Sequence, residues 1–179
     1  MNCFFHLKAV GLACLLTTII PLQPQAQKTV SFDVAMVRNL THRLNGLNLS
    51  CFYHFSEKLT GGVEMNRFFP VAKGGEGKSV RVSAWDFDLN LHYLIRLGQR
   101  FAVYPLSGIS HTSELESDDG TGEKNYQRFW SFNTGAGLLV SVGRWIPHAE
   151  YMLTWGKQNQ RFLLVGVSYE IGWGRNEKE

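Results

Sequence analysis

The sequence predicts an all-β fold, an eight-stranded antiparallel up-and-down transmembrane β-barrel, and three observations favour it. Residues 85–97 alternate between large apolar side chains, from Trp85 to Leu97 at the odd positions, and mainly polar ones at the even positions. A period of two indicates a β-strand, and a run of this length is what a tilted strand needs to cross a bilayer. The pattern recurs along the chain, and lysine is absent from the recurring segments.

Each alternating segment has one apolar face and one polar or small-residue face. The weakest is residues 61–69, where Val63 and Met65 alternate with Glu64 and Asn66. Within residues 100–112, Pro105 predicts an interruption because proline cannot donate a ladder hydrogen bond. The eight predicted strands are residues 30–36, 47–55, 61–69, 85–97, 100–112, 130–142, 145–155 and 163–173.

The connections between these strands alternate in length. Tight turns are predicted at residues 56–58, 98–99 and 143–144, and longer polar loops at residues 38–46, 70–79 and 114–127, with a shorter loop at 156–160. Transmembrane barrels have short periplasmic turns and longer outer loops. An even number of strands also places both termini on the periplasmic side.

The direction of the apolar face separates a membrane barrel from a soluble lipocalin-like binder. Eight strands enclose a space only just wide enough for side chains, so the apolar faces would overfill the inside. Every lysine from Lys58 onward falls in a predicted turn, loop or tail, which argues against a water-facing wall. The large aromatic residues gather at strand ends, as in the two interfacial girdles of membrane barrels. The predicted girdle consists of Tyr53, Phe55, Phe69, Trp85, Tyr93, Trp130, Trp145, Trp155 and Trp173.

If the apolar face contacts lipid, the charged residues of the other face project into the lumen. A buried isolated ion is very unfavourable, so these groups must be paired or hydrated. Acids outnumber fixed bases, and we expect a packed polar network, with a narrow channel for small solutes as the alternative. The predicted lumen residues are Asp33, His54, Glu64, Asp86, Asp88, His92, Arg96, His148, Glu150 and Glu170.

The first 26 residues are predicted to be a signal peptide. A short segment with one lysine precedes the apolar residues 9–22, and a small residue, Ala26, precedes the expected cleavage point. The barrel then spans residues 27–173, followed by a short polar tail at 174–179. Only Cys51 remains in the mature chain, which fits export without disulfides. A net charge of +3 with 18% charged residues does not indicate nucleic-acid binding.

Four stretches, residues 85–94, 101–109, 133–137 and 166–169, resemble the small outer-membrane β-barrel proteins of the OmpA/OmpX type. The similarity is greatest to the compact barrels of the Bacteroidetes and covers about residues 28–173. It implies a location in the outer membrane of a Gram-negative bacterium, in contact with outer-membrane lipid and lipopolysaccharide. Gly166, Tyr169 and Ile171 resemble the last-strand signal that the barrel-assembly machinery reads, although Leu164 stands where a polar residue is usual. The resemblance assigns no catalytic residue and no extracellular ligand.

One local pattern raises an enzymatic alternative. His111 and Ser113, with Glu114 beside them, resemble the His-x-Ser pair and glutamate of an outer-membrane barrel that removes acyl chains from lipid A. Histidine can deprotonate serine when an acid orients its ring. No zinc motif, calcium loop or cofactor motif is present in the sequence, so we expect no metal and no cofactor. The leading expectation is a non-enzymatic barrel with a structural role or a surface-interaction role through its loops.

Overall fold

The structure is a computed structural model that describes residues 29–75, 78–118 and 120–172. The predicted signal peptide, the predicted tail and the girdle residue Trp173 lie outside the described residues. Nine strands are present in this part of the chain. They are β1 (Thr29–Asn39), β2 (Leu44–His54), β3 (Leu59–Gly75), β4 (Lys78–Tyr93), β5 (Ile95–Arg96), β6 (Phe101–Asp118), β7 (Lys124–Val140), β8 (Trp145–Gly156) and β9 (Gln160–Gly172).

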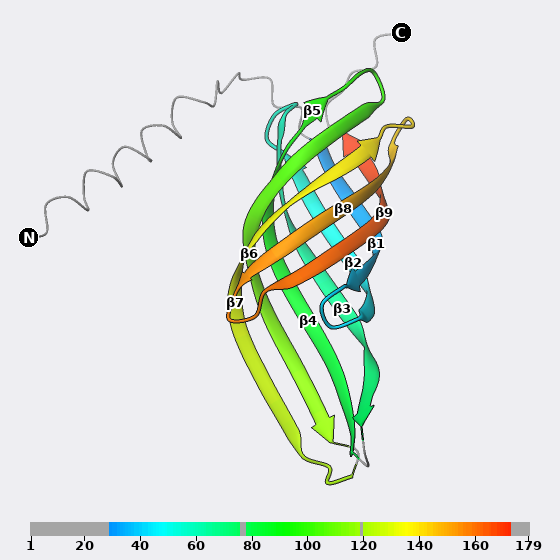
Figure 1. Cartoon of the computed structure of the whole chain (residues 1–179). Helices are drawn as coiled ribbons and strands as arrows, with labels where there is room; N and C mark the ends of the chain where they lie inside the picture. The colour runs from blue at the N-terminus through cyan, green and yellow to red at the C-terminus, as the bar shows by residue number, and fades with distance from the viewer. Residues whose placement is uncertain (1–28, 76–77, 119, 173–179) are drawn as a thin grey trace, which may run out of the picture.

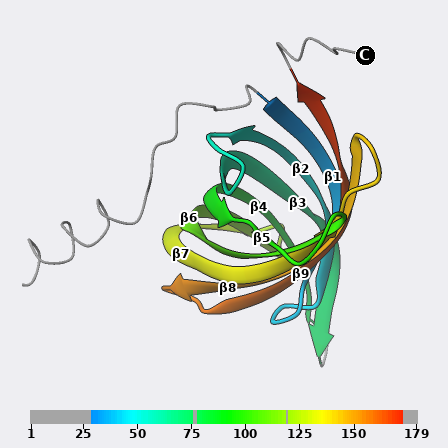
Figure 2. The same ribbon diagram turned by 90° about the horizontal axis from the view of Figure 1, so that it is seen from above.

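Antiparallel pairing closes these strands into a barrel. The order is β4-β3-β2-β1-β9-β8-β7-β6-β5, and β4 also pairs with β6, so the sheet has no open seam around its girth. The two-residue β5 continues β4 and pairs with the same neighbour, β6. Counted around the barrel, the sheet therefore has eight strand positions. Seen along its length, the sheet encloses a central space (Figure 2). The predicted eight-stranded antiparallel barrel is confirmed. None of the described residues forms a helix long and apolar enough to cross a membrane.

Pro105 explains why β4 and β5 are separate ranges. The pairs His92↔Leu106 and Ile95↔Val103 share one register, and this register places Pro105 opposite Tyr93, where no pair forms. Proline has no backbone N–H, so it cannot complete the ladder there. On the other side of β4, Leu94 N donates to Lys58 O at 2.7 Å and continues the register with β3. The predicted interruption therefore falls on the neighbouring strand, while β6 itself continues through Pro105 and pairs with β7.

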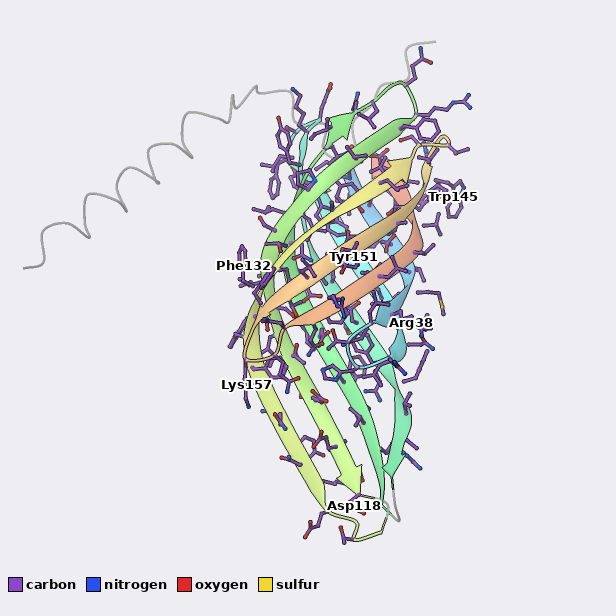
Figure 3. The ribbon with its side chains drawn as sticks, viewed as in Figure 1. Arg38, Asp118, Phe132, Trp145, Tyr151 and Lys157 are labelled. Atoms are coloured by element: carbon purple, nitrogen blue, oxygen red, sulfur yellow. The ribbon has the colours of Figure 1, made fainter. Side chains whose placement is uncertain are left out.

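The two faces of the barrel have opposite chemistry. On β4, the Phe87 side chain is 53% exposed on the outside, whereas its neighbour Asp88 is 3% exposed on the inside. Phe132, Trp145 and Tyr151 likewise project from the outer surface (Figure 3). The lipocalin-like alternative, with an apolar interior and a polar exterior, is wrong for this chain.

The strands are unequal in length, and the difference is confined to one half of the barrel. β3, β4, β6 and β7 have 17, 16, 18 and 17 residues, whereas β1, β2, β8 and β9 have 11, 11, 12 and 13. The excess forms a projecting wall at one end of the barrel (Figure 1), which consists of residues 69–75, 78–84, 114–118 and 124–130. We call this the loop end, and the opposite end, with the tight turns and Thr29, the turn end.

The predicted loops at residues 70–79 and 114–127 are therefore wrong, because most of each segment is strand. These segments are polar on both faces, so they lack the apolar alternation on which the prediction depended. Their strand structure comes from pairing with a neighbour, as in Val82↔Glu116 and Glu116↔Asn125. The predicted loop at 38–46 also shrinks, because β1 runs to Asn39 and β2 begins at Leu44.

The interior contains an apolar plug at the loop end. Phe68 and Phe162 are 1% and 2% exposed, and their ring centroids lie 5.8 Å apart. The plug, as we define it, consists of Val37, Leu44, Phe68, Val82, Ala84, Met152 and Phe162. Burial of these side chains against one another closes the lumen at this end.

Candidate functional site

The middle of the lumen is held by a network in which asparagine amides bind carboxyl groups. Glu64 on β3 accepts hydrogen bonds from Asn90 Nδ2 at 2.7 Å and from Asn48 Nδ2 at 3.3 Å. Asp88 on β4 accepts one from Asn66 Nδ2 at 2.8 Å, and Asn66 itself accepts one from Asn48 at 2.8 Å. Neutral amides thus occupy the places where arginine or lysine could stand. They join β2, β3 and β4 across the inside of the barrel.

A second polar group links the opposite side of the barrel, toward the turn end. Asp33 on β1 accepts a hydrogen bond from Ser168 Oγ at 2.8 Å, and its Oδ2 lies 3.4 Å from Nδ1 of His148 on β8. Tyr104 donates to Glu150 Oε2 at 3.2 Å. The Tyr104 ring packs onto Gly137, where a Cβ atom would collide with it, so glycine is required at this close approach. The Asp33–Ser168 bond joins neighbouring strands, whereas the contacts to His148 and Glu150 each cross one intervening strand. These polar side chains therefore link β1, β6, β8 and β9 on the inside of the barrel.

His92 lies between these two groups. Its ring stacks on Tyr104 with a centroid separation of 4.8 Å and lies 4.7 Å from the Phe52 ring centroid. Its Nε2 atom is 3.9 Å from Glu64 Oε1, which is too long for a hydrogen bond. Aromatic packing, more than a polar contact, holds this histidine in place.

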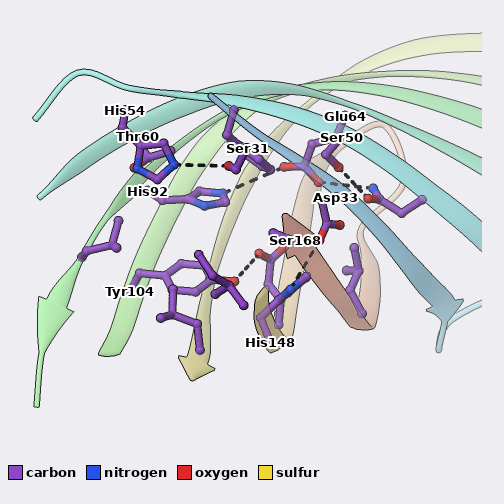
Figure 4. A pocket seen from close by; sticks show the side chains of 17 residues that line it. Ser31, Asp33, Ser50, His54, Thr60, Glu64, His92, Tyr104, His148 and Ser168 are labelled. Carbon is purple, nitrogen blue, oxygen red and sulfur yellow. Dashed lines mark hydrogen bonds and ion pairs between the residues drawn. The ribbon is translucent and has the colours of Figure 1, made fainter. Parts of the chain in front are cut away.

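A small cavity lies among these residues, and Figure 4 shows its lining. It extends from Leu94 and Ile146, near the turn end, to Leu164 beside the apolar plug. The room for the centres of water molecules is about 60 Å³, enough for several waters. Glu150 is 5% exposed, lines the cavity and has one oxygen, Oε1, without a hydrogen-bond partner. The arrangement is a polar pocket that borders the apolar plug.

Charge is sorted between the inside and the outside of the barrel. Six carboxylic acids are buried on the strands, whereas no arginine or lysine is buried among the residues whose burial the structure describes. The buried acids are Asp33, Glu64, Asp86, Asp88, Glu114 and Glu150. Because unpaired buried charge is very unfavourable, bound protons or cations that enter with water must balance these groups.

Arg96 corrects the sequence-based list of lumen residues. Its side chain is 65% exposed at the turn end, and Nη1 lies 3.8 Å from Oε2 of Glu57, which is 63% exposed. The pairing gap at Leu94 ends the regular alternation just before this position, and the long side chain reaches water. Arg96 therefore cannot balance the lumen acids.

The other predicted lumen residues all line the inside or its mouth. Asp33, Glu64, Asp86, Asp88, His92 and Glu150 are buried, and His148 is nearly so. His54 and Glu170 meet at the turn-end mouth, where Nε2 and Oε1 lie 3.8 Å apart. The prediction missed the residues that bind these acids, namely Asn48, Asn66, Asn90, Asn133, Tyr104 and Ser168. The four asparagines share the polar face of their strands, and that shared phase was the available signal.

The predicted girdle residues lie on the outer surface. Exposed fractions range from 37% for Trp85 to 67% for Trp130 among the eight that the structure describes. Trp145 packs edge-on against Tyr169 at 4.8 Å, and Trp155 Nε1 donates to Thr134 Oγ1 at 2.8 Å. A partly polar contact of this kind suits a ring at a membrane–water interface.

The geometry does not assemble the His-x-Ser pair with an acid. His111 and Ser113 both face outward, and the His111 ring lies 4.8 Å from the Trp130 ring. Glu114 faces the interior and is 6% exposed, so it lies on the opposite side of the sheet. Within the described residues, no group of three or more His, Cys, Asp or Glu side chains could hold a metal ion.

The fold is similar to solved structures of small outer-membrane barrels. The N-terminal β-barrel domain of Pseudomonas aeruginosa OprF matches with a TM-score of 0.67 at 16% identity, over 82% of this chain and 100% of that one. Neisserial surface protein A matches with a TM-score of 0.56 at 14% identity, over 81% and 95%. Ail, the attachment invasion locus protein of Yersinia pestis, matches with a TM-score of 0.54 at 15% identity, over 80% and 95%.

No known protein family matches the sequence, and no curated protein is similar to it in sequence. At identities this low, the structural likeness concerns the fold alone. The chain is a closed eight-stranded β-barrel with the architecture of the small outer-membrane barrels.

Proposed function

We propose that this protein is an integral outer-membrane β-barrel of a Gram-negative bacterium that presents its projecting wall to a partner outside the cell. The apolar outer face, the two aromatic girdles and the likeness to outer-membrane barrels support the membrane location. The sequence resemblance to compact barrels of the Bacteroidetes supports a host of that group. The last strand, β9, contains Gly166, Tyr169 and Ile171 and closes the ring against β1, which supports its recognition by the barrel-assembly machinery.

The observation that supports the surface role best is the free edge of β7. Among the described residues, β7 pairs with β8 only from Ser131 onward, so residues 124–130 have no strand on that side. Asp118 N donates to Glu123 O, and Ser141 N donates to Arg100 O, so the odd residues of β7 face β6. Backbone groups alternate along a strand, which leaves those of Lys124, Tyr126 and Arg128 directed at the open edge. An extended peptide can add a strand to such an edge.

The other edge of the wall is less suited to strand addition. β3 beyond Phe68 has no β2 partner, but its register shifts between Phe68 and Val71, and it includes Pro70. Bulges and proline are common protections of exposed edges, because they bend the strand and remove a donor. The contrast between the two edges supports β7 as the strand that takes part in the interaction.

The channel alternative is less well supported. The plug closes the lumen at the loop end, and the cavity ends against it. The hydrolase alternative lacks an acid on the outer face beside His111 and Ser113. The lumen network then has a structural role, since it fixes strand register from the inside.

Gel mobility tests the membrane part of the proposal. Outer-membrane material solubilised in mild detergent should show the folded barrel migrating differently before and after boiling. A protein that is soluble in the periplasm and shows no shift would contradict the location.

Cysteine labelling tests the direction of the wall. In a Cys51→Ser background, Ser117→Cys on the wall should react with a membrane-impermeant maleimide on intact cells, while Gly98→Cys at the turn end should not. Labelling of the Gly98 position alone would reverse the orientation and remove the wall from the cell surface.

A matched pair of variants tests the edge itself. Tyr126→Pro removes the backbone donor on the free side, whereas Tyr126→Ala removes the same side chain but keeps the donor. Peptides selected on the purified barrel from a displayed library of unstructured sequences should bind the wild type and Tyr126→Ala and lose binding to Tyr126→Pro. Equal binding to all three would exclude strand addition at β7.

A further inference from the structure

Four residues form one row across the outer surface at the base of the projecting wall. The register pairs Arg67 on β3 with Trp85 on β4, Trp85 with Ser113 on β6, and Ser113 with Arg128 on β7. Directly paired residues of neighbouring strands lie on the same face of a sheet. Trp85 is 37% exposed on the outside, so the whole row faces outward. We call it the Arg67–Arg128 row.

The two arginines of this row are available for an external anion. The guanidinium carbon of Arg67 lies 4.5 Å from the centroid of the Trp85 ring, which holds the group over the indole. Within the described residues, no ion pair joins Arg67 or Arg128 to a carboxylate. Four acids of the same strands, Glu64, Asp86, Asp88 and Glu114, are buried on the inner face. The row therefore presents positive charge that the protein does not neutralise.

The same sorting of charge holds around the whole loop end. The strand residues Arg38, Lys124 and Arg161 are exposed, whereas, among the residues whose burial the structure describes, every buried charged residue there is an acid. Figure 3 shows Arg38 at the level where the short strands end, with Lys157 somewhat closer to the wall, at the opposite edge of the view. An outer surface with fixed positive charge attracts anionic groups.

The depth of the Arg67–Arg128 row matches a lipid headgroup. The next row toward the middle of the barrel is Met65, Phe87, His111 and Trp130, in which Phe87 and Trp130 are 53% and 67% exposed. Trp85 and Trp130 belong to the aromatic girdle, and such rings mark the boundary between acyl chains and headgroups. An anion bound by the row would thus have an apolar surface directly below it, where acyl chains could lie.

We propose that the Arg67–Arg128 row binds the phosphate groups of an outer-leaflet glycolipid, the lipid A part of lipopolysaccharide. Arginine presents several N–H donors in a plane and binds phosphate oxygens in pairs. Ser113, between Trp85 and Arg128, adds a hydroxyl donor to the row. Arg67 and Arg128 are three strand spacings apart, roughly 14 Å, so each can bind a separate phosphate of one lipid. The acyl chains pack on Phe87 and Trp130 below.

Lipid binding to the purified barrel in a maltoside detergent tests the inference by native mass spectrometry. The probes are diphosphoryl lipid A and the same lipid after removal of its phosphates. Wild-type barrel should bind diphosphoryl lipid A saturably, and the double variant Arg67→Gln/Arg128→Gln should bind it about tenfold more weakly or worse, because two cationic contacts are lost. The control Arg96→Gln/Arg100→Gln removes two exposed arginines at the turn end and should bind like the wild type.

Each other outcome overturns the inference. Equal binding by the wild type and Arg67→Gln/Arg128→Gln would place the lipid elsewhere, and equal binding of the dephosphorylated lipid would remove the role of phosphate. Displacement of lipid A by inorganic phosphate at equal concentration would point to a soluble anion instead of a lipid.

The inference rests on the outer-membrane location proposed above. The experiments can contradict the lipid A site without contradicting that location. A barrel that shows the gel shift on heating but binds no lipid A retains its location and loses only this site. Strand addition at β7 involves the edge of the wall and not its outer face, so its test is independent of lipid binding.

Discussion

The two ends of the barrel interior differ in the side chains that fill them. At the loop end, Phe68 and Phe162 pack with other apolar residues of the plug and exclude water. Toward the turn end, Asp33, His148 and Glu150 surround a cavity with room for water. Both ends belong to the same eight-stranded barrel, so the fold alone does not decide whether the lumen is filled or leaves room for water. The side chains make it a pocket that is closed toward the projecting wall.

Opening the plug should have the largest effect. The double variant Phe68→Ala/Phe162→Ala removes two rings that are almost fully buried. We expect the wild-type barrel to show no conductance in planar bilayers and this variant to show stepwise conductance. The matched control Phe87→Ala/Phe132→Ala removes the same side chains from the outer surface, where they are 53% and 50% exposed, and should show no conductance. Wild-type conductance as large as that of the plug variant would show that the plug is not the barrier.

The free energy of unfolding should distinguish the plug from the outer surface when single phenylalanines are replaced. Phe162→Ala leaves a cavity in a packed interior and should lower the free energy of unfolding by about 3–5 kcal/mol. Phe132→Ala shortens an outward-facing, half-exposed side chain and should lower this free energy by about 1–2 kcal/mol. Urea titration of the barrel in lipid vesicles, followed by gel mobility, measures both values. Similar losses for the two variants would mean that the plug is loosely packed.

The polar network should contribute less per residue than the plug. Asn66 is fully buried, donates to Asp88 and accepts from Asn48, so Asn66→Ala leaves one hydrogen-bonding position of each of these two buried groups unsatisfied. We expect a loss of about 2–3 kcal/mol in the same titration, because an unsatisfied buried group costs about 1–3 kcal/mol and nearby water can replace part of the bonding. The exposed Asn45→Ala on β2 is the control. No loss for Asn66→Ala would show that cavity water replaces the amide fully.

Arg96 should show the smallest effect. Its ion pair with Glu57 at 3.8 Å is open to solvent on both sides. Exposed pairs of this kind contribute little, so Arg96→Gln should change the free energy of unfolding by less than about 0.5 kcal/mol. A loss comparable to that of Asn66→Ala would indicate that Arg96 does balance the lumen acids, as its sequence phase suggested.

The sequence was sufficient to predict a strand and the direction of its side chains where that strand has one apolar face. Residues 85–97 predicted outward Trp85 and Phe87 and inward Asp86 and Asp88, and the structure places them so, because alternation is a local property of a strand. It was insufficient for residues 70–79 and 114–127. These two segments are mainly polar on both faces, so no apolar face reveals the strands.

The plug was hidden for a related reason. Phe68 and Phe69 are adjacent in the sequence, and only one of them can face the lumen. The structure buries Phe68 and leaves Phe69 44% exposed just before the shift in register. The ring that Phe68 meets belongs to Phe162, more than ninety residues away. Local periodicity contains no information about such a contact.

The sequence by itself determined the β class, the strand number and the outward face of each strand that alternates between apolar and polar residues, because these depend on a period of two within a few residues. Only the tertiary structure decided which polar groups meet. Asn48, Glu64, Asn66 and Asp88 come from three strands, and ring closure brings them together in one register. Closure also decided which strands continue past the others as a wall, because a polar segment forms a strand only when a neighbour satisfies its backbone hydrogen bonds.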